Sequence, residues 1–278
     1  MRKQTLASGP SKCGYPTAQE SNMIDLSKIT KDGKAFFLAY DQGMEHGPSD
    51  FDDENIDPES ILNIAVDGNF TAVILQKGIA EKYYSNSNFV QKIPLILKLN
   101  GKTNLIDDPD PYSPQICTPL EAAQLNAFAV GYTIYVGSRH EAKMFEEFGD
   151  IVNKAHDLSL PVIGWMYIRG SGTQGKDVKE LTAYAARLGL ELGADIIKIK
   201  YPGDEKSLRW AVESAGKTKV VVSGGALADE QVFLQTVQTV MNAGCIGLAV
   251  GRNIWQSENP LELSEKVKNI IFSKSVTT

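Results

Sequence analysis

Short apolar runs recur along the chain, and most are followed by a polar loop and then by a stretch with helical periodicity. The apolar runs span residues 35–40, 72–75, 94–99, 128–132, 162–167, 195–200, 219–223 and 246–250. Amphipathic stretches span residues 139–158, 178–192, 204–215, 229–242 and 261–272. The runs are apolar on both faces, which is typical of parallel strands covered by helices.

The order of these segments predicts the fold. Gly193, Gly216 and Gly244 each follow an amphipathic stretch and precede an apolar run, as glycines at helix C-termini do. Eight strand–helix alternations predict an α/β fold, a single-domain (β/α)8 TIM barrel over residues 31–278, with residues 1–30 as an N-terminal extension. A doubly wound open sheet is the alternative, but residues 41–47 lack the G-x-G-x-x-G spacing that its first turn needs.

Composition narrows the class of protein. The net charge is -6 and the chain has no Lys/Arg-rich tract, so we expect no nucleic-acid partner. No apolar run approaches the roughly 18 residues of a membrane span, and the first residues lack the apolar core of a signal peptide. Cys13, Cys117 and Cys245 have neither disulfide nor metal-ligand spacing, which favours a reduced, cytoplasmic setting.

Polar residues stand at the ends of the predicted strands, where the active site of a TIM barrel lies. They are Asp41 after the first strand, Lys98 on the third, Trp165, Tyr167 and Arg169 on or after the fifth, and Lys198 and Lys200 on the sixth. Because side chains alternate along a strand, Lys198 and Lys200 are expected on one face and the neighbouring isoleucines on the other. A lysine buried beside a second cation becomes a neutral nucleophile that attacks carbonyl groups.

The ends of the seventh and eighth strands predict a phosphate site. Ser223, Gly224 and Gly225 follow the seventh strand, and Gly251 and Arg252 follow the eighth. The loops after these two strands often bind phosphate in TIM barrels, because glycine lets backbone N–H groups approach the anion and an arginine adds charged donors.

A phosphate site next to a buried lysine indicates Schiff-base chemistry on a phosphorylated ketone. Tyr167 is the expected general acid/base, since it faces inward on the strand next to the lysines. Asp41 is expected to balance the lysine charge or to bind substrate hydroxyls. The three histidines are scattered and form no metal motif, so we expect no metal and no other cofactor.

At this point the sequence resembles the archaeal-type class I fructose-1,6-bisphosphate aldolases. The matching segments are LAYDQGMEHGPSDF (38–51), KGIAEKYY (77–84), PLILKLNGKT (94–103), VGYTIY (130–135), WMYIRG (165–170), ELGADIIKIKYPGD (191–204), SGG (223–225) and AVGRNIWQ (249–256). Gln42 and Ile168 depart from the family pattern, which often has histidine and proline at these positions.

The resemblance implies that Lys198 forms the Schiff base, that Tyr167 is the acid/base residue, and that Asp41 and Trp165 line the substrate site. The motifs of the seventh and eighth strands would then hold the C1 phosphate of the sugar, and Arg169 and Lys98 are candidates for the C6 phosphate. Lys200 is a further candidate for substrate binding. The resemblance also implies a homo-oligomer such as a decamer.

The predicted function is reversible cleavage of fructose 1,6-bisphosphate to dihydroxyacetone phosphate and glyceraldehyde 3-phosphate, a step of glycolysis and gluconeogenesis. Two alternatives stay open. One is a sibling Schiff-base synthase or thiolase acting on a related phosphorylated ketone. The other is a barrel that binds sugar phosphates without turnover.

Overall fold

Eight parallel strands close into a barrel in which each strand pairs with the next and β1 pairs with β8. The computed structural model describes residues 24–225 and 227–273. The strands are β1 (Ala35–Tyr40), β2 (Ala72–Gln76), β3 (Leu95–Lys98), β4 (Ala127–Val136), β5 (Val162–Ile168), β6 (Ile196–Ile199), β7 (Lys219–Ser223) and β8 (Gly247–Val250). The prediction of a (β/α)8 barrel is therefore confirmed.

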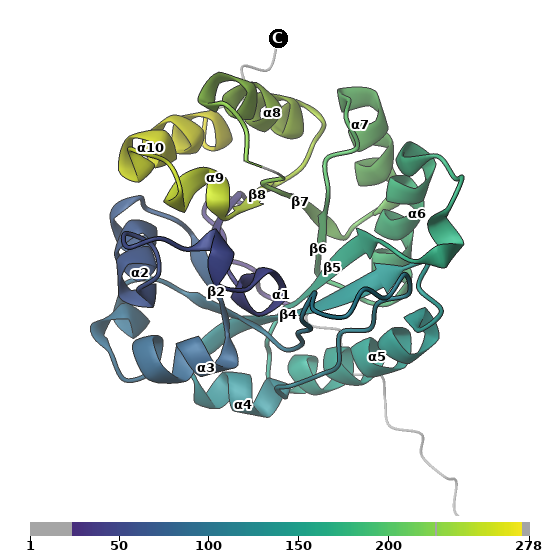
Figure 1. Ribbon diagram of the computed structural model, residues 1–278, viewed down its shortest axis with the longest axis horizontal. Helices are drawn as coiled ribbons and strands as arrows, with labels where there is room; N and C mark the ends of the chain where they lie inside the picture. The colour runs from purple at the N-terminus through teal and green to yellow at the C-terminus, as the bar shows by residue number, and fades with distance from the viewer. Residues whose placement is uncertain (1–23, 226, 274–278) are drawn as a thin grey trace, which may run out of the picture.

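Helices form a ring around the barrel (Figure 1). The longer ones are α2 (Pro58–Asp67), α4 (Pro119–Gln124), α5 (Glu141–Asp157), α6 (Val178–Glu191), α7 (Glu205–Ser214), α8 (Glu230–Asn242) and α10 (Pro260–Ile271). Shorter segments are α1 (Gly43–His46), η1 (Pro48–Asp50), α3 (Lys77–Ile79), η2 (Ala80–Tyr84), η3 (Asn88–Gln91), η4 (Ser171–Thr173) and α9 (Arg252–Trp255). Asp57, Asp177, Asp204 and Asp229 cap the N-termini of α2, α6, α7 and α8 with their side chains.

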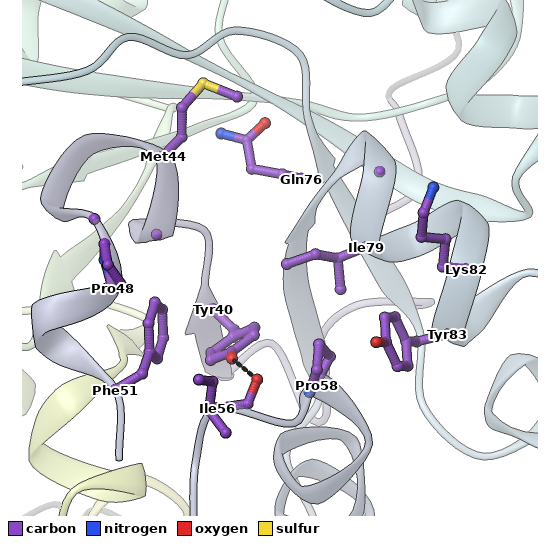
Figure 2. A pocket seen from close by; sticks show the side chains of 13 residues that line it. Tyr40, Met44, Pro48, Phe51, Ile56, Pro58, Gln76, Ile79, Lys82 and Tyr83 are labelled. Atoms are coloured by element: carbon purple, nitrogen blue, oxygen red, sulfur yellow. Dashed lines mark hydrogen bonds between the residues drawn. The ribbon is translucent and has the colours of Figure 1, made fainter. Parts of the chain in front are cut away.

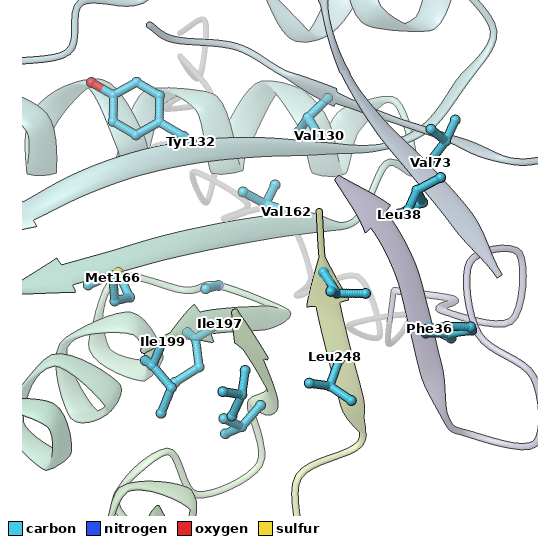
Figure 3. Packing of buried hydrophobic residues seen from close by; sticks show 14 of the residues in the cluster. Phe36, Leu38, Val73, Val130, Tyr132, Val162, Met166, Ile197, Ile199 and Leu248 are labelled. Carbon is cyan, nitrogen blue, oxygen red and sulfur yellow. The ribbon is translucent and has the colours of Figure 1, made fainter. Parts of the chain in front are cut away.

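Two layers of apolar side chains follow from the alternation along the strands. One cluster fills the barrel and includes Phe37, Ile74, Ile96, Trp165 and Ile196. The other lies between strands and helices, and Figure 3 shows members of it such as Phe36, Val73 and Ile197. Both faces of every strand are covered by apolar side chains. The inward polar residues near the strand ends are therefore the ones that are available for catalysis or binding.

Most of the strand boundaries predicted from the sequence agree closely with the structure, and two differences matter for the site. The strand β4 continues to Val136 instead of ending near residue 132, and this carries Tyr135 to the barrel mouth. The strand β6 ends at Ile199, before Lys200 and Tyr201-Pro202, because a proline cannot continue the ladder.

The N-terminal part of the described chain already packs on the barrel. Ile29 is fully buried in the inner cluster. The domain boundary at residue 30 stays a prediction, and residues 1–23, including Cys13, lie outside the described residues. Within the described ranges, no helix combines the length and the apolar character needed to cross a bilayer.

Candidate active site

A cavity of about 670 Å³ opens at the carboxyl ends of the strands. Of the residues singled out from the sequence, it is lined by Asp41, Lys98, Tyr167, Arg169, Lys198, Lys200, Ser223, Gly224, Gly225, Gly251 and Arg252. Trp165 does not border the cavity and is buried in the barrel beneath it. The fold thus gathers residues that are separated by more than two hundred positions in the chain.

Lys198 lies on the inner face of β6 and is only 4% exposed. Burial lowers the pKa of its ammonium group to about 8, with Asp41 opposing this shift and Lys98 adding to it. At neutral pH, a pKa of about 8 leaves roughly one amine in ten unprotonated, against fewer than one in a thousand for an ordinary lysine. A larger share of Lys198 is therefore in the neutral form, which is the form of an amine that can attack a carbonyl group.

The second buried cation of the site is Lys98. Its Nζ lies 3.0 Å from Oδ2 of Asp41, and both residues are more than nine-tenths buried. Burial opposes ionisation of Asp41, but Lys98 and Lys198 together hold the pKa of this carboxyl below its ordinary value. Asp41 is accordingly a carboxylate that balances two ammonium groups.

The expectation that Lys200 lies buried beside Lys198 is wrong. Lys200 follows the end of β6 and is exposed, with its Nζ 5.6 Å from the ring centre of Tyr167. The same sequence signal, a lysine alternating with apolar residues at a strand end, occurs at Lys98 on β3. The pattern therefore marks Lys98 as well as Lys198 as inward lysines. That these two lysines are the ones that come close follows only from the closure of the barrel, which brings β3 and β6 around one interior.

Tyr167 lies on β5, two residues beyond Trp165, which pairs in register with Lys198 of β6. The pKa of its phenol is raised well above the ordinary value, first by burial and then by the negative charges of Asp41 and Glu45. The phenol is therefore protonated in the free protein and is available as a proton donor.

Glycines bring the loops after β7 and β8 close together. A Cβ atom on Gly224 would lie 2.7 Å from Cγ2 of Val250, and one on Gly251 would lie 2.8 Å from the carbonyl oxygen of Ala39. Neither position has room for a side chain. The backbone of both loops can consequently face the cavity at close range, as the predicted phosphate site requires.

Asn253 and Arg252 connect the loops after β7 and β8 to their surroundings. The Asn253 side chain donates to the carbonyl of Gly224 and accepts from the N–H of Ala228, which fixes one loop against the other. Nη1 of Arg252 lies 3.6 Å from Oδ2 of Asp50, so the guanidinium is held at the cavity edge by a long ion pair. Sequence analysis did not single out Asn253, whose role depends on contact between two loops.

The cavity is also lined by a charged group that sequence analysis missed. Oε1 of Glu45, on the short helix α1, lies 3.0 Å from Nη1 of Arg169 and accepts a hydrogen bond from Tyr135. Arg169 also lies over the Tyr135 ring, at 5.6 Å from its centre. No periodic pattern marks Glu45, because α1 has only four residues.

A second pocket of about 550 Å³ lies beside the first, between α1 and α3 (Figure 2). Its walls are mainly apolar and include Tyr40, Met44, Phe51 and Ile79. The helix α1 separates the two cavities. It lines the apolar one with Met44 and the polar one with Glu45 and His46.

Across residues 24–225 and 227–273, no group of three or more His, Cys, Asp or Glu side chains is arranged to hold a metal ion. The polar groups at the floor of the main cavity are two lysines and the carboxylate between them. This set suits covalent attack by an amine on a carbonyl group.

The model of the DeoC/LacD family aldolases matches residues 35–257. The chain is 49% identical over 250 residues to a class 1 fructose-bisphosphate aldolase of Thermoproteus tenax, with 89% of this chain and 93% of the relative covered. It is 43% identical over 252 residues to a protein of the same name in Halobacterium salinarum, with 90% and 94% covered.

A solved structure has the same fold. It is an archaeal fructose-1,6-bisphosphate aldolase with its catalytic lysine covalently bound to the carbinolamine intermediate of the substrate. The TM-score is 0.84 at 46% sequence identity, over 88% of this chain and 97% of that one.

Proposed function

The chain belongs to the DeoC/LacD family of aldolases, and we propose that it is a class I fructose-bisphosphate aldolase whose Schiff base forms on Lys198. The reaction is the reversible cleavage of fructose 1,6-bisphosphate to dihydroxyacetone phosphate and glyceraldehyde 3-phosphate. The observation that carries the proposal is the Lys198 ammonium, buried opposite the Lys98–Asp41 pair and with its pKa lowered to about 8.

The first steps join the sugar to the protein. Neutral Nζ of Lys198 attacks the C2 carbonyl carbon and forms a carbinolamine. The Tyr167 phenol then donates the proton with which the C2 hydroxyl leaves as water, which gives a protonated imine and the Tyr167 phenolate. The imine carries a positive charge where the free amine had none, and Asp41 offers the nearest negative charge to stabilise it. The Lys98–Asp41 contact keeps this carboxylate ionised inside the barrel.

Cleavage then needs one proton to move twice. The phenolate oxygen of Tyr167 takes the proton of the C4 hydroxyl, the C3–C4 bond breaks, and its electron pair moves into the enamine on Lys198. Glyceraldehyde 3-phosphate leaves, and the Tyr167 phenol returns the proton to C3 of the enamine. Hydrolysis of the new protonated imine releases dihydroxyacetone phosphate and the neutral amine, and the proton that is set free returns to the Tyr167 phenolate.

The two ends of the cavity suit the two phosphates. Gly224, Gly251 and Arg252 are proposed to hold the C1 phosphate, and the exposed Arg169, which follows β5 and lines the same cavity, is proposed to bind the C6 phosphate. Lys98 is better explained as the charge partner of Asp41 than as a phosphate ligand, because its ammonium is buried and already paired. Trp165 supports the site from below.

We also propose that the protein works as a homo-oligomer in the cytoplasm, such as a decamer, with residues 1–30 as an extension to the barrel. Two free, buried cysteines, Cys117 and Cys245, fit a reducing compartment.

Borohydride trapping tests the proposed function. Reduction in the presence of dihydroxyacetone phosphate is expected to add one reduced substrate to the protein, on the peptide that contains Lys198, as read by mass spectrometry. Cleavage of fructose 1,6-bisphosphate is expected to survive EDTA, since the imine supplies the electron sink that a metal would otherwise provide. A barrel that only binds sugar phosphates would trap nothing, and a sibling synthase or thiolase would trap its own substrate in preference.

Arg252→Ala is expected to raise KM for fructose 1,6-bisphosphate by about 10- to 100-fold, the size of a lost charge-assisted hydrogen bond to phosphate. The kcat is expected to change little, because the C1 phosphate is remote from the bond that breaks. Steady-state kinetics measures both constants. Arg209→Ala on α7 is the matched control, since Arg209 pairs with Glu205 outside the cavity. A fall in kcat at unchanged KM would contradict the assignment.

A further inference from the structure

The ring of Trp165 lies in a space that exists because residue 131 is glycine. Residue 131 is on the inner face of β4, where it pairs in register with Lys98 of β3. A Cβ atom built on Gly131 would lie 1.6 Å from Cζ3 and 1.8 Å from Cη2 of the Trp165 indole. Real atoms never approach so closely, so alanine at this position would force the ring to move.

Packing holds the indole in place, with no hydrogen bond to the described part of the chain. Its N–H group is buried and has no hydrogen-bond partner among the described residues. The ring belongs to the inner cluster, packed with Ala129, Ile163 and Ile196. Because no hydrogen bond from the described ranges fixes the indole, its position depends on packing, and the bare backbone at Gly131 is what leaves room for the six-membered ring.

That position matters because of what lies next to the ring. Nζ of Lys198 is 5.2 Å from the ring centre, and Trp165 pairs in register with Lys198 across β5 and β6. The indole therefore reaches from β5 across β4 to Gly131, the residue that pairs with Lys98, and it lies against Lys198. A ring in this position excludes water from one side of Lys198, and burial is the largest cause of the lowered pKa of this lysine.

We propose that Gly131 is a positioning residue of the active site, whose missing side chain leaves the space in which the Trp165 indole lies against Lys198. The proposal rests on the proposed function in its choice of Lys198 as nucleophile. It adds to the active site a residue of β4, a strand that supplies none of the groups proposed to react with the substrate. The charged groups that act on Lys198 are Asp41 on the β1 side and Lys98 of β3, while Tyr167 of β5 borders the same cavity, and the substitution at 131 removes none of them.

Gly131→Ala tests the proposal in the full-length protein. The rate at which acetic anhydride modifies Lys198 is measured against pH by peptide mass spectrometry, which reports the titration of this amine without any turnover. A displaced indole admits water, so the midpoint is expected to rise from about 8 toward the ordinary 10.5. Each unit of that rise removes about nine-tenths of the neutral amine at neutral pH, so the rate of borohydride trapping is expected to fall about tenfold per unit.

Gly189→Ala is the matched control. A Cβ atom on Gly189, in α6, would lie 2.3 Å from Cγ2 of Ile197, which is on the outer face of β6, the strand that carries Lys198. This variant also crowds β6 but leaves the indole untouched, so its midpoint is expected to stay near that of the parent. A folded Gly131→Ala protein with the parent midpoint, or an equal shift in Gly189→Ala, would overturn the proposal.

A Gly131→Ala protein that fails to fold leaves a second comparison. In the Trp165→Phe background the shorter ring makes room for alanine at 131, so the double variant is expected to fold. At each pH, the rate at which its Lys198 is modified is expected to lie within about twofold of the rate in Trp165→Phe. Loss of folding or a further shift there would show that Gly131 acts through something other than the indole. A parent protein that titrates as expected but traps no substrate would refute the proposed function alone.

Discussion

Replacing Lys198 by methionine is expected to abolish turnover and borohydride trapping while the barrel stays folded. Methionine has a similar length and no charge, so it suits a position that is 4% exposed on an apolar strand. The substitution removes the only group proposed to bond covalently with the substrate. Asp41 keeps Lys98 as its ion-pair partner, so no unpaired carboxylate is left inside the barrel. Activity, trapping and thermal unfolding together check the expectation.

Lys200→Met is the matched control for this result. Lys200 is two residues further along the chain and exposed at the cavity edge, so its loss is expected to preserve trapping. Retention of activity in Lys198→Met together with its loss in Lys200→Met would show that the nucleophile has been assigned to the wrong lysine.

Tyr167→Phe is expected to lower the rate of cleavage by about 10²- to 10⁴-fold, the usual contribution of a general acid/base group. The change removes one oxygen and keeps the ring, so packing on β5 is preserved. Lys198 is unaltered, so the imine with dihydroxyacetone phosphate is expected to form and to be trapped by borohydride. Comparing the cleavage rate with the amount of trapped substrate separates proton transfer from covalent attack.

Tyr132→Phe provides the matched control for a lost phenol. Tyr132 is fully buried on the outer face of β4, and its hydroxyl donates to Glu147. Removing that hydroxyl is expected to lower the free energy of unfolding without slowing catalysis. If Tyr167→Phe cleaves within a few fold of the parent, another group moves the proton, and Asp41 or Lys200 would be the next to replace.

Much of this protein follows from patterns that are local in the sequence. The strands β1 and β7 coincide with their predicted ranges, and α6 and α8 begin and end within one residue of theirs. Gly193, Gly216 and Gly244, predicted at helix C-termini, all have positive φ angles. These features depend on periodicity and on backbone conformations that few residues adopt, and both can be identified one segment at a time.

The strand-end rule also found most of the cavity lining. Once eight strands are assigned to a barrel, their carboxyl ends must converge, and the polar residues standing there become neighbours whatever their separation in the chain. Asp41, Tyr167, Lys198 and Arg252 could be selected for this reason, before any distance between them was known.

What the sequence could not determine was which groups touch. Lys200 is nearest to Lys198 along the chain, yet Lys98 is the cation that shares the barrel interior with it, because opposite strands of a closed barrel face each other. Glu45 meets Arg169 across 124 positions, and the Trp165 ring lies over Gly131 on the neighbouring strand. Hydrophobic periodicity determined the barrel and its inward positions, whereas pairing, burial and the resulting pKa of Lys198 were decided by tertiary structure, because they depend on distances between segments that no local pattern records.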